Sequence, residues 1–188
     1  MKRHAQQRGF SVTELMIVLT IVAILLGIAV PSFRYITNSY RMSAEVNSLL
    51  GDMMYARSEA IKEGQDVTVC ASANGATCSG ASTWQSGWVV YPNPNNALAN
   101  PAAGSILRLQ TAFTGTTPDS FVANPALSAI TYNREGFGTT AGGFPNNTTI
   151  VLHDPTANSG WTRCLWLTPQ GVPSTETPAV DTSGTCLE

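Results

Sequence analysis

The sequence predicts an α+β protein, in which one long N-terminal helix precedes a head built from antiparallel β-strands. Three observations lead to this prediction. Residues 10–30 form a 21-residue segment in which 16 residues are apolar. A helical spacing of apolar residues then continues to Gly64, and beyond it short β-rich runs take over. The 188 residues have room for one ordinary domain and one additional segment.

The first nine residues, MKRHAQQRG, hold three of the ten Lys and Arg residues of the chain. As a helix, segment 10–30 would be roughly 32 Å long at ~1.5 Å per residue, which matches a hydrocarbon core of about 30 Å. Basic residues before a span predict that this end stays in the cytoplasm. A secretory signal peptide has a shorter apolar region followed by a small-residue cleavage site. We therefore expect a retained helix that crosses the membrane once.

Glu14 is the one charged residue within this apolar segment. A carboxylate in a spanning helix costs a few kcal/mol unless it finds a partner or reaches the lipid headgroups. Two interpretations follow: Glu14 lies shallow enough to reach the headgroups, or it pairs with a positive charge on another copy of the helix. Cleavage after Gly9 would create such a charge, because Phe10 would become the new amino terminus.

Pro31 follows the apolar segment, and its missing amide and its ring predict a kink or local break in the helix. Helical spacing resumes beyond it, and Gly64 predicts the end of the helix. One apolar stripe is spaced by three and four residues: Met42, Val46, Leu49, Met53, Ala56 and Ala60. We expect this stripe to pack on the head rather than to bind a cofactor.

After Gly64, six short runs rich in β-branched and aromatic residues are bounded by Gly, Pro, Asn or Ser. The runs are 66–70, 87–91, 105–109, 129–132, 149–152 and 163–167. They predict one or two antiparallel sheets laid on the C-terminal half of the helix. Segments 93–104 and 114–124 are expected to be loops, glycine-rich 136–143 a flexible loop, and the tail from Val172 poorly ordered.

The four cysteines are Cys70, Cys78, Cys164 and Cys186. In a chain whose bulk is exported, cysteines indicate disulfides. Of the three ways to pair them, the short separation favours Cys70–Cys78, which leaves Cys164–Cys186. A zinc site is the competing idea, but these spacings match none of the close cysteine pairs of zinc sites. We expect two disulfides and no metal.

The sequence holds no recognisable catalytic group. His153 is the one histidine beyond the first nine residues, and its neighbour Asp154 would point to the opposite face of a strand. Segment 136–143 lacks the Lys-Ser/Thr ending of a phosphate loop. We expect no enzymatic activity and no cofactor. Beyond Gly64, three arginines face seven acidic residues, which disfavours nucleic-acid binding through phosphate neutralisation.

The basic leader ending in Gly9, followed by Phe10, Glu14 and Pro31 in an apolar helix, resembles the class III signal of type IV prepilins and type II secretion pseudopilins. The resemblance implies a type IV pilin fold, cleavage after Gly9 by a prepilin peptidase, and N-methylation of Phe10. It implies that Glu14 neutralises the Phe10 amine of a neighbouring pilin, with an inner-membrane assembly platform as a further partner. The protein would reside in the inner membrane with its head in the periplasm, and then in a surface pilus.

Segments 56–62, 67–70, 84–91 and 132–136 resemble the GspH/FimT family of minor pilins and pseudopilins. The resemblance implies a minor pilin, at the tip of a type IV pilus, that supports assembly and motility or adhesion. The alternatives are a minor pseudopilin of type II secretion and a DNA receptor for natural transformation.

The family's DNA-binding members carry a Gly-Arg-x-Arg motif. The matching place here begins at Gly171 and lacks both arginines, so that Arg134 and Arg163 remain as residual DNA contacts. We divide the chain into a leader (1–9), an apolar helix (10–31), an amphipathic helix (32–64) and a β-rich head with a disulfide-bonded tail (65–188).

Overall fold

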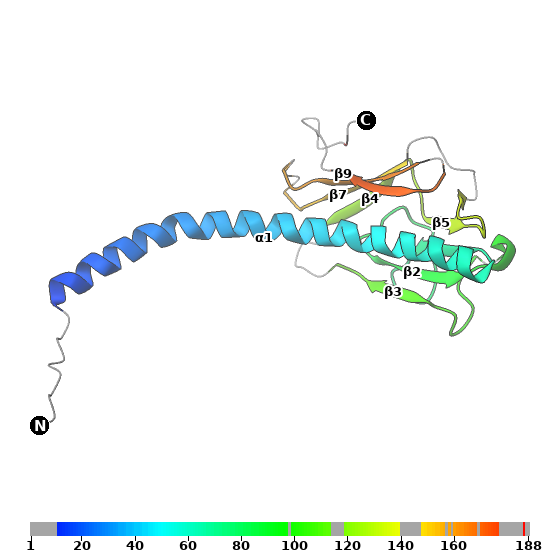
Figure 1. Ribbon diagram of the computed structural model, residues 1–188, viewed down its shortest axis with the longest axis horizontal. Coiled ribbons are helices and arrows are strands. Elements are labelled where there is room, and N and C mark those ends of the chain that lie inside the picture. Colours follow the sequence, from blue (N-terminus) through cyan, green and yellow to red (C-terminus); the bar gives the residue numbers. More distant parts are fainter. Residues whose placement is uncertain are drawn as a thin grey trace, which may run out of the picture. The chain divides into compact units, whose positions relative to one another are not determined.

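The computed structural model describes residues 11–97, 99–113, 119–139, 148–156, 158, 160–168, 170–176 and 186. The predicted leader, with Gly9, and also Phe10 lie outside these residues. The chain divides into two compact units, Met1–Ser39 and Tyr40–Glu188. Helix α1, Val12–Glu63, contributes to both of them (Figure 1).

Of the kink or local break expected at Pro31, the break is wrong, because helix α1 continues through this residue. Proline removes one amide donor from the hydrogen-bond ladder. The turns on either side continue the ladder within a helix of 52 residues. One missing bond in so long a helix does not end it. The predicted C-terminal end is confirmed, because α1 stops at Glu63 and Gly64 takes the left-handed conformation with φ +65°.

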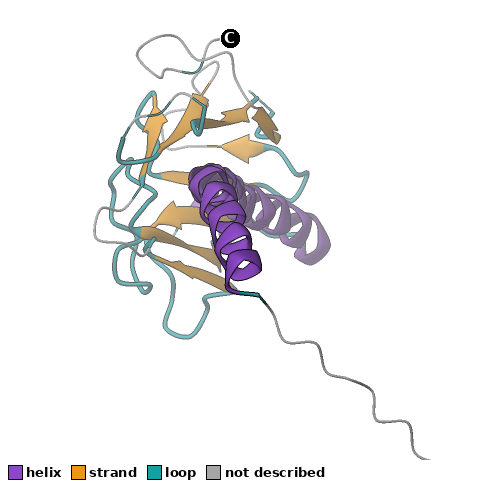
Figure 2. Cartoon of the chain, turned by 90° about the vertical axis from the view of Figure 1, so that its left-hand side faces the viewer, coloured by secondary structure: helices purple, strands orange, loops and turns teal. Residues whose placement is uncertain are grey.

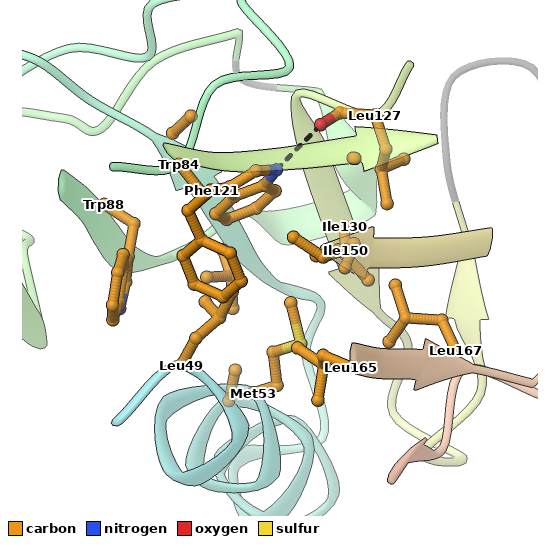
Figure 3. Close-up of a cluster of buried hydrophobic side chains, with 14 of the residues drawn as sticks. Leu49, Met53, Trp84, Trp88, Phe121, Leu127, Ile130, Ile150, Leu165 and Leu167 are labelled. Carbon is orange, nitrogen blue, oxygen red and sulfur yellow. Dashed lines mark hydrogen bonds between the residues drawn. The ribbon is translucent and has the colours of Figure 1, made fainter. Parts of the chain in front are cut away.

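In the second unit, α1 buries the stripe that the spacing predicts. Its six members are at most 2% exposed: Met42, Val46, Leu49, Met53, Ala56 and Ala60. The stripe packs against apolar side chains from both sheets, as Leu49 and Met53 show in Figure 3. Because a helix with one apolar stripe needs a protein surface to cover it, the head and this part of the helix form one core.

The head contains two antiparallel sheets, visible as two groups of strands in Figure 2. The first sheet has the order β3-β2-β1-β5-β6 and comprises β1 (Val67–Ala71), β2 (Gly87–Pro92), β3 (Arg108–Thr111), β5 (Ala129–Tyr132) and β6 (Gly138–Thr139). The second has the order β4-β7-β8-β9 and comprises β4 (Ser120–Asn124), β7 (Thr148–His153), β8 (Arg163–Leu167) and β9 (Pro173–Glu176). The antiparallel prediction is confirmed.

Four details of the predicted strands were wrong. Segment 114–124 was expected to be a loop but contains β4, which pairs with β7 over its whole length. The tail contains β9, which pairs with β8, and the glycine-rich segment contains the short β6. The third run begins later than expected, as β3 at Arg108. In each case hydrogen bonds to a partner strand, rather than local apolar content, define the strand.

Two tryptophans anchor the core. Trp84 donates from Nε1 to the carbonyl oxygen of Leu127 over 2.9 Å, the bond drawn in Figure 3. Trp88 donates from Nε1 to Oδ2 of Asp52 over 2.8 Å. Both indoles are fully buried, and a buried indole N–H needs such an acceptor. Arg108 contacts the other carboxylate oxygen of Asp52 at 2.9 Å, so this buried charge is paired.

Both disulfides join the cysteines that the spacing favoured. Cys70 in β1 is bonded to Cys78, with their Cα atoms 5.6 Å apart. Cys164 in β8 is bonded to Cys186, with their Cα atoms 6.2 Å apart. The first bond closes a short loop over the outer face of the first sheet, and the second ties the C-terminal tail to the second sheet.

Candidate assembly site

The first part of α1 exposes its apolar side chains on all sides. From Val12 to Ile36, fourteen of its Val, Leu, Ile and Met side chains are at least 42% exposed. An 18-residue window has a mean hydropathy of 2.7 and no burial, so the helix is long and apolar enough to cross a membrane. A helix that is apolar all round needs lipid or other helices around it.

The hydroxyl groups in this part of the helix are compatible with such surroundings. Thr20 donates to the carbonyl oxygen of Met16 over 2.8 Å, and Thr37 donates to that of Phe33 over the same distance. Ser11 and Thr13 share a hydrogen bond of 2.7 Å. The hydroxyl protons of Thr20 and Thr37 therefore need no acceptor from water or from another chain.

Glu14 differs from these hydroxyls. It lies in the first turn of α1, where the helix dipole favours a negative charge. It is exposed, and it makes no hydrogen bond or ion pair with any other residue that the structure describes. The next charged residue along the chain is Arg34. The first part of the helix thus offers one carboxylate within an otherwise uncharged apolar surface.

Arg134 lies in the turn between β5 and β6. Its side chain is 72% exposed, and its Nε is 3.7 Å from a carboxylate oxygen of Glu135. The turn rests against the C-terminal end of α1, since a Cβ added to Gly136 would lie 2.8 Å from Cδ1 of Ile61. Arg134 is accessible, but its charge is matched by its neighbour.

Arg163 begins β8 and lies elsewhere. Its Nε donates to Oγ of Ser43 over 3.1 Å, and its Nη1 donates to the carbonyl oxygen of Thr162 over 2.9 Å. Ser43 and Ile61 are about 18 residues apart on one helix, or roughly 27 Å. The structure therefore places the two candidate DNA contacts at opposite ends of the head rather than in one site.

A group of charged side chains joins α1 to the start of β4. Arg41 contacts Oδ1 of buried Asp119 at 3.0 Å, and Glu45 is hydrogen-bonded to Asp119. Burial, followed by the nearby Asp119, raises the pKa of Glu45 to about 7. The raised pKa favours the protonated form of Glu45 beside Asp119. This pair has no local signal in the sequence, because Glu45 and Asp119 lie far apart in the chain.

Two family models match the chain. One describes a prokaryotic N-terminal methylation motif and covers residues 4–30, and the other describes the type II transport protein GspH and covers residues 45–171. The second match spans more than half of the chain. The chain belongs to the GspH family. The methylation motif implies processing by a prepilin peptidase and assembly with other pilins, and the apolar helix fits membrane anchoring.

Solved structures show the same type IV pilin fold. Two are crystal forms of the type IV minor pilin FimU of Pseudomonas aeruginosa. One has a TM-score of 0.55 at 18% identity and covers 73% of this chain and 89% of that one. The other has a TM-score of 0.52 at 19% identity and covers 71% and 91%. No curated protein matches the chain.

This GspH-family protein is thus a minor pilin or pseudopilin of a type IV pilus or a type II secretion system. Proteins of this family and fold are structural rather than enzymatic. The candidate assembly site is the N-terminal helix with Glu14, and the sequence indicates it because the motif is continuous. The partner group that we expect for Glu14, on Phe10, lies outside the described residues.

Proposed function

We propose that this protein is a minor pilin of a type IV pilus, placed at or near the fibre tip, where it supports pilus assembly and motility or adhesion. The observation that carries the proposal is Glu14, the one carboxylate on an exposed apolar helix. The fold that the protein shares with a type IV minor pilin supports the pilus, and its disulfide-bonded head suits an extracellular fibre.

Glu14 favours transfer of the helix from the lipid into the fibre, because its charge is costly in the bilayer. An ionised side chain at the centre of a bilayer helix costs about 3 kcal/mol on insertion scales. Cleavage after Gly9 and methylation of Phe10 would leave a charged amine at the new terminus. Pairing Glu14 with that amine on a neighbouring subunit removes both penalties at once, and the apolar surface around Glu14 packs on the neighbour's helix.

We infer the cellular arrangement from the same segments. The leader (1–9) stays in the cytoplasm until the prepilin peptidase removes it, because basic residues precede the span. Segment 10–31 crosses the inner membrane, segment 32–64 continues into the head, and residues 65–188 fold in the periplasm. An inner-membrane assembly platform then moves the subunit into the fibre, where its neighbours are other pilins.

Replacing Glu14 tests this proposal. In the native host, at native expression, Glu14→Gln should remain in the membrane and begin at methylated Phe10 by intact mass. Its amount in sheared fibres should fall by more than about tenfold, since losing ~1.4 kcal/mol already gives that factor. Arg34→Gln is the matched control, because it removes the other charge from the exposed helix, and it should assemble normally. Normal assembly of Glu14→Gln would contradict the proposed pairing.

A type II secretion pseudopilin is the second candidate, and the matched family description favours it. Deleting the gene separates the two. Loss of surface fibres or twitching with normal protein export supports the pilus, whereas loss of exported enzymes with normal twitching supports the pseudopilus. Complementation by the wild-type chain is the control in both assays.

A DNA receptor is the least favoured candidate, because Arg134 and Arg163 lie apart and both are engaged by other groups. Binding of the detergent-solubilised protein to duplex DNA should be no tighter than the weak nonspecific range of about 10⁻⁴ M at physiological salt. Submicromolar, salt-sensitive binding in fluorescence anisotropy would instead favour a DNA receptor as the function of this protein.

A further inference from the structure

A row of hydroxyl groups crosses the outer face of the first sheet. Successive residues of a strand point to opposite faces, and in β1 Val67 and Val69 point into the core while Thr68 points away from it. Thr68 pairs directly with Tyr91 of β2 and with Thr131 of β5. Oγ1 of Thr68 lies 2.7 Å from Oγ1 of Thr131, and Tyr91 is hydrogen-bonded to Thr68 as well.

Two loops rise on either side of this row and are fixed at their bases. The loop after β1 is tied down by the Cys70–Cys78 disulfide. The loop after β2 is tied down by Asn93, which is 1% exposed and donates from Nδ2 to Oγ1 of Thr68 over 2.8 Å. The loops also contact each other, because the amide of Cys78 donates to Oδ1 of Asn100 over 2.9 Å.

Between the loops and the sheet lies a cavity of about 540 Å³. Small-molecule sites typically measure about 300–1,000 Å³. The cavity has the hydroxyl row at its base, and its other polar groups come from the loops, notably Ser79, Asn96, Asn100 and Ser128. None of the described residues that line it carries a charge. The polar residues at the base are at most 5% exposed, so they are held in place before any ligand arrives.

Asn96 shows how the base is held. Its Oδ1 accepts from Oγ1 of Thr131 over 3.1 Å and from Nδ2 of Asn93 over 3.2 Å. Its own amide NH₂ donates to none of the residues that the structure describes, and so remains available to a ligand. Asn95 and Asn96 both have positive φ values, 57° and 51°, an unusual conformation that recurs at binding sites.

We propose that this cavity binds a neutral sugar. Hydroxyls and carboxamides both donate and accept hydrogen bonds, as the hydroxyls of a sugar do, so the two sets match in either direction. A phosphate or carboxylate ligand would need a cationic partner, and a metal ion would need carboxylate or imidazole ligands. An apolar ligand would strip water from polar groups without replacing their bonds.

The topology argues against a peptide from a neighbouring subunit. An extended peptide binds a sheet by adding to a free edge. At the base of the cavity β1 lies between β2 and β5, and Thr131 of β5 is itself paired with Thr139 of β6. The main-chain groups there are already used, which leaves side-chain recognition of a compact ligand.

Saturation-transfer NMR on the full chain tests this proposal. The protein would be held in a phosphocholine detergent, since a sugar-based detergent would compete. Lactose and diacetylchitobiose are the neutral probes, and sialyllactose is the charged one. We expect saturation transfer to at least one neutral probe at millimolar concentration and no preference for the charged one. No transfer to either neutral probe, or a preference for sialyllactose, would overturn the proposal.

Two tryptophan substitutions locate the signal. Ala99 lines the cavity, whereas Ala103 is an exposed residue of the same loop outside its lining. Ala99→Trp should abolish transfer, and Ala103→Trp should leave it unchanged. Asn100→Ala should weaken binding by up to about tenfold, as expected for one lost hydrogen bond. Transfer that persists in Ala99→Trp would contradict the site. Fibre incorporation of Ala99→Trp should be normal, which separates this proposal from the one on Glu14.

Discussion

Leu25 and Leu49 lie in the same helix but in different environments: Leu25 is 60% exposed, and Leu49 is fully buried. Around Leu25, apolar residues occupy every side of α1, so the helix is covered only by something outside the chain. Around Leu49, they form a single stripe, and the head covers it. The periodicity of apolar residues along one helix thus distinguishes a surface kept for other molecules from a surface used in folding.

Charged residues follow the same division. In the first unit, Glu14 has no partner among the described residues. In the second, three charged residues of α1 are engaged by the head: Arg41 and Glu45 lie against Asp119, and Asp52 meets Trp88 and Arg108. Arg57 is the exception, since its buried Nε has no hydrogen-bond partner among the described residues. A single chain therefore contains a charge that its fold leaves unpaired and charges that its fold satisfies.

The largest expected effect comes from testing this division directly. Leu49→Ala should lower the free energy of unfolding of the head by about 2–5 kcal/mol, because it leaves a cavity in the core. Leu25→Ala removes the same atoms from an exposed position and should leave the head's stability unchanged. Thermal unfolding of the full chain in detergent, followed by near-ultraviolet circular dichroism of the buried tryptophans, measures both. Equal shifts in the two variants would break the comparison.

The comparison also explains what the sequence could predict. The apolar helix, its stripe and the N-terminal motif are continuous patterns, so each is readable from neighbouring residues. Strand β4, Ser120–Asn124, has only Phe121 and Ala123 facing inward, and β9, Pro173–Glu176, has no strongly apolar residue at all. Both are strands because β7 and β8 supply hydrogen-bonding partners. The pairing of β4 with β7 depends on residues far along the chain. Strand β9 follows its partner β8 closely, but it lacks the apolar residues by which a strand is recognised from its own sequence.

The candidate functional features also differ in whether neighbouring residues in the sequence indicate them. Glu14 could be identified because its surroundings are local. The Glu45–Asp119 pair could not, because it joins a helix to a strand start far along the chain. The hydroxyl row of Tyr91, Thr68 and Thr131 depends on the register of three strands, which single-strand patterns do not define.

A second prediction concerns the pH dependence of the head. Burial, then Asp119, raises the pKa of Glu45 from its ordinary value of 4.5 to about 7. The folded state therefore binds this proton more tightly than the unfolded state. The resulting stability is fully present below pH 4.5 and is lost as the pH rises through about 7. Burial raises the pKa of Asp119 in the same direction, whereas Arg41 opposes it.

Glu45→Gln keeps a hydrogen-bond donor beside Asp119 without the titrating group. Its midpoint of thermal unfolding should exceed that of the wild type at pH 8, and the difference should shrink towards pH 5. His153→Gln is the control, because His153 is another group of the head whose titration could change the stability in this pH range. Burial lowers the pKa of His153, so its contribution is lost as the pH falls rather than as it rises. A wild-type advantage at pH 8 would refute the assignment of the proton to Glu45.

The smallest expected effect is the difference in stability that the head loses when one or the other of its two disulfides is removed. Cys164–Cys186 joins residues 22 apart, and Cys70–Cys78 joins residues eight apart. In the chain-entropy estimate, closing the longer loop stabilises by ~3.4 kcal/mol and closing the shorter one by ~2.6 kcal/mol. Non-reducing peptide mapping checks the premise, since a Cys70–Cys164 linkage would remove it.

Cys186→Ser should therefore lower the free energy of unfolding of the head more than Cys78→Ser does, by a difference of less than about 1 kcal/mol. Its thermal midpoint should accordingly be slightly the lower of the two. Local structure adds to this difference. The loop closed by Cys78 has hydrogen bonds of its own: Ser72 donates from Oγ to the carbonyl oxygen of Thr77 over 2.7 Å, and Oδ1 of Asn74 accepts from the amide of Thr77 over 2.9 Å. These bonds keep part of the loop ordered when Cys78 is lost. A larger drop for Cys78→Ser would show instead that the disulfide over the first sheet, rather than the one that holds the tail, limits the stability of the head.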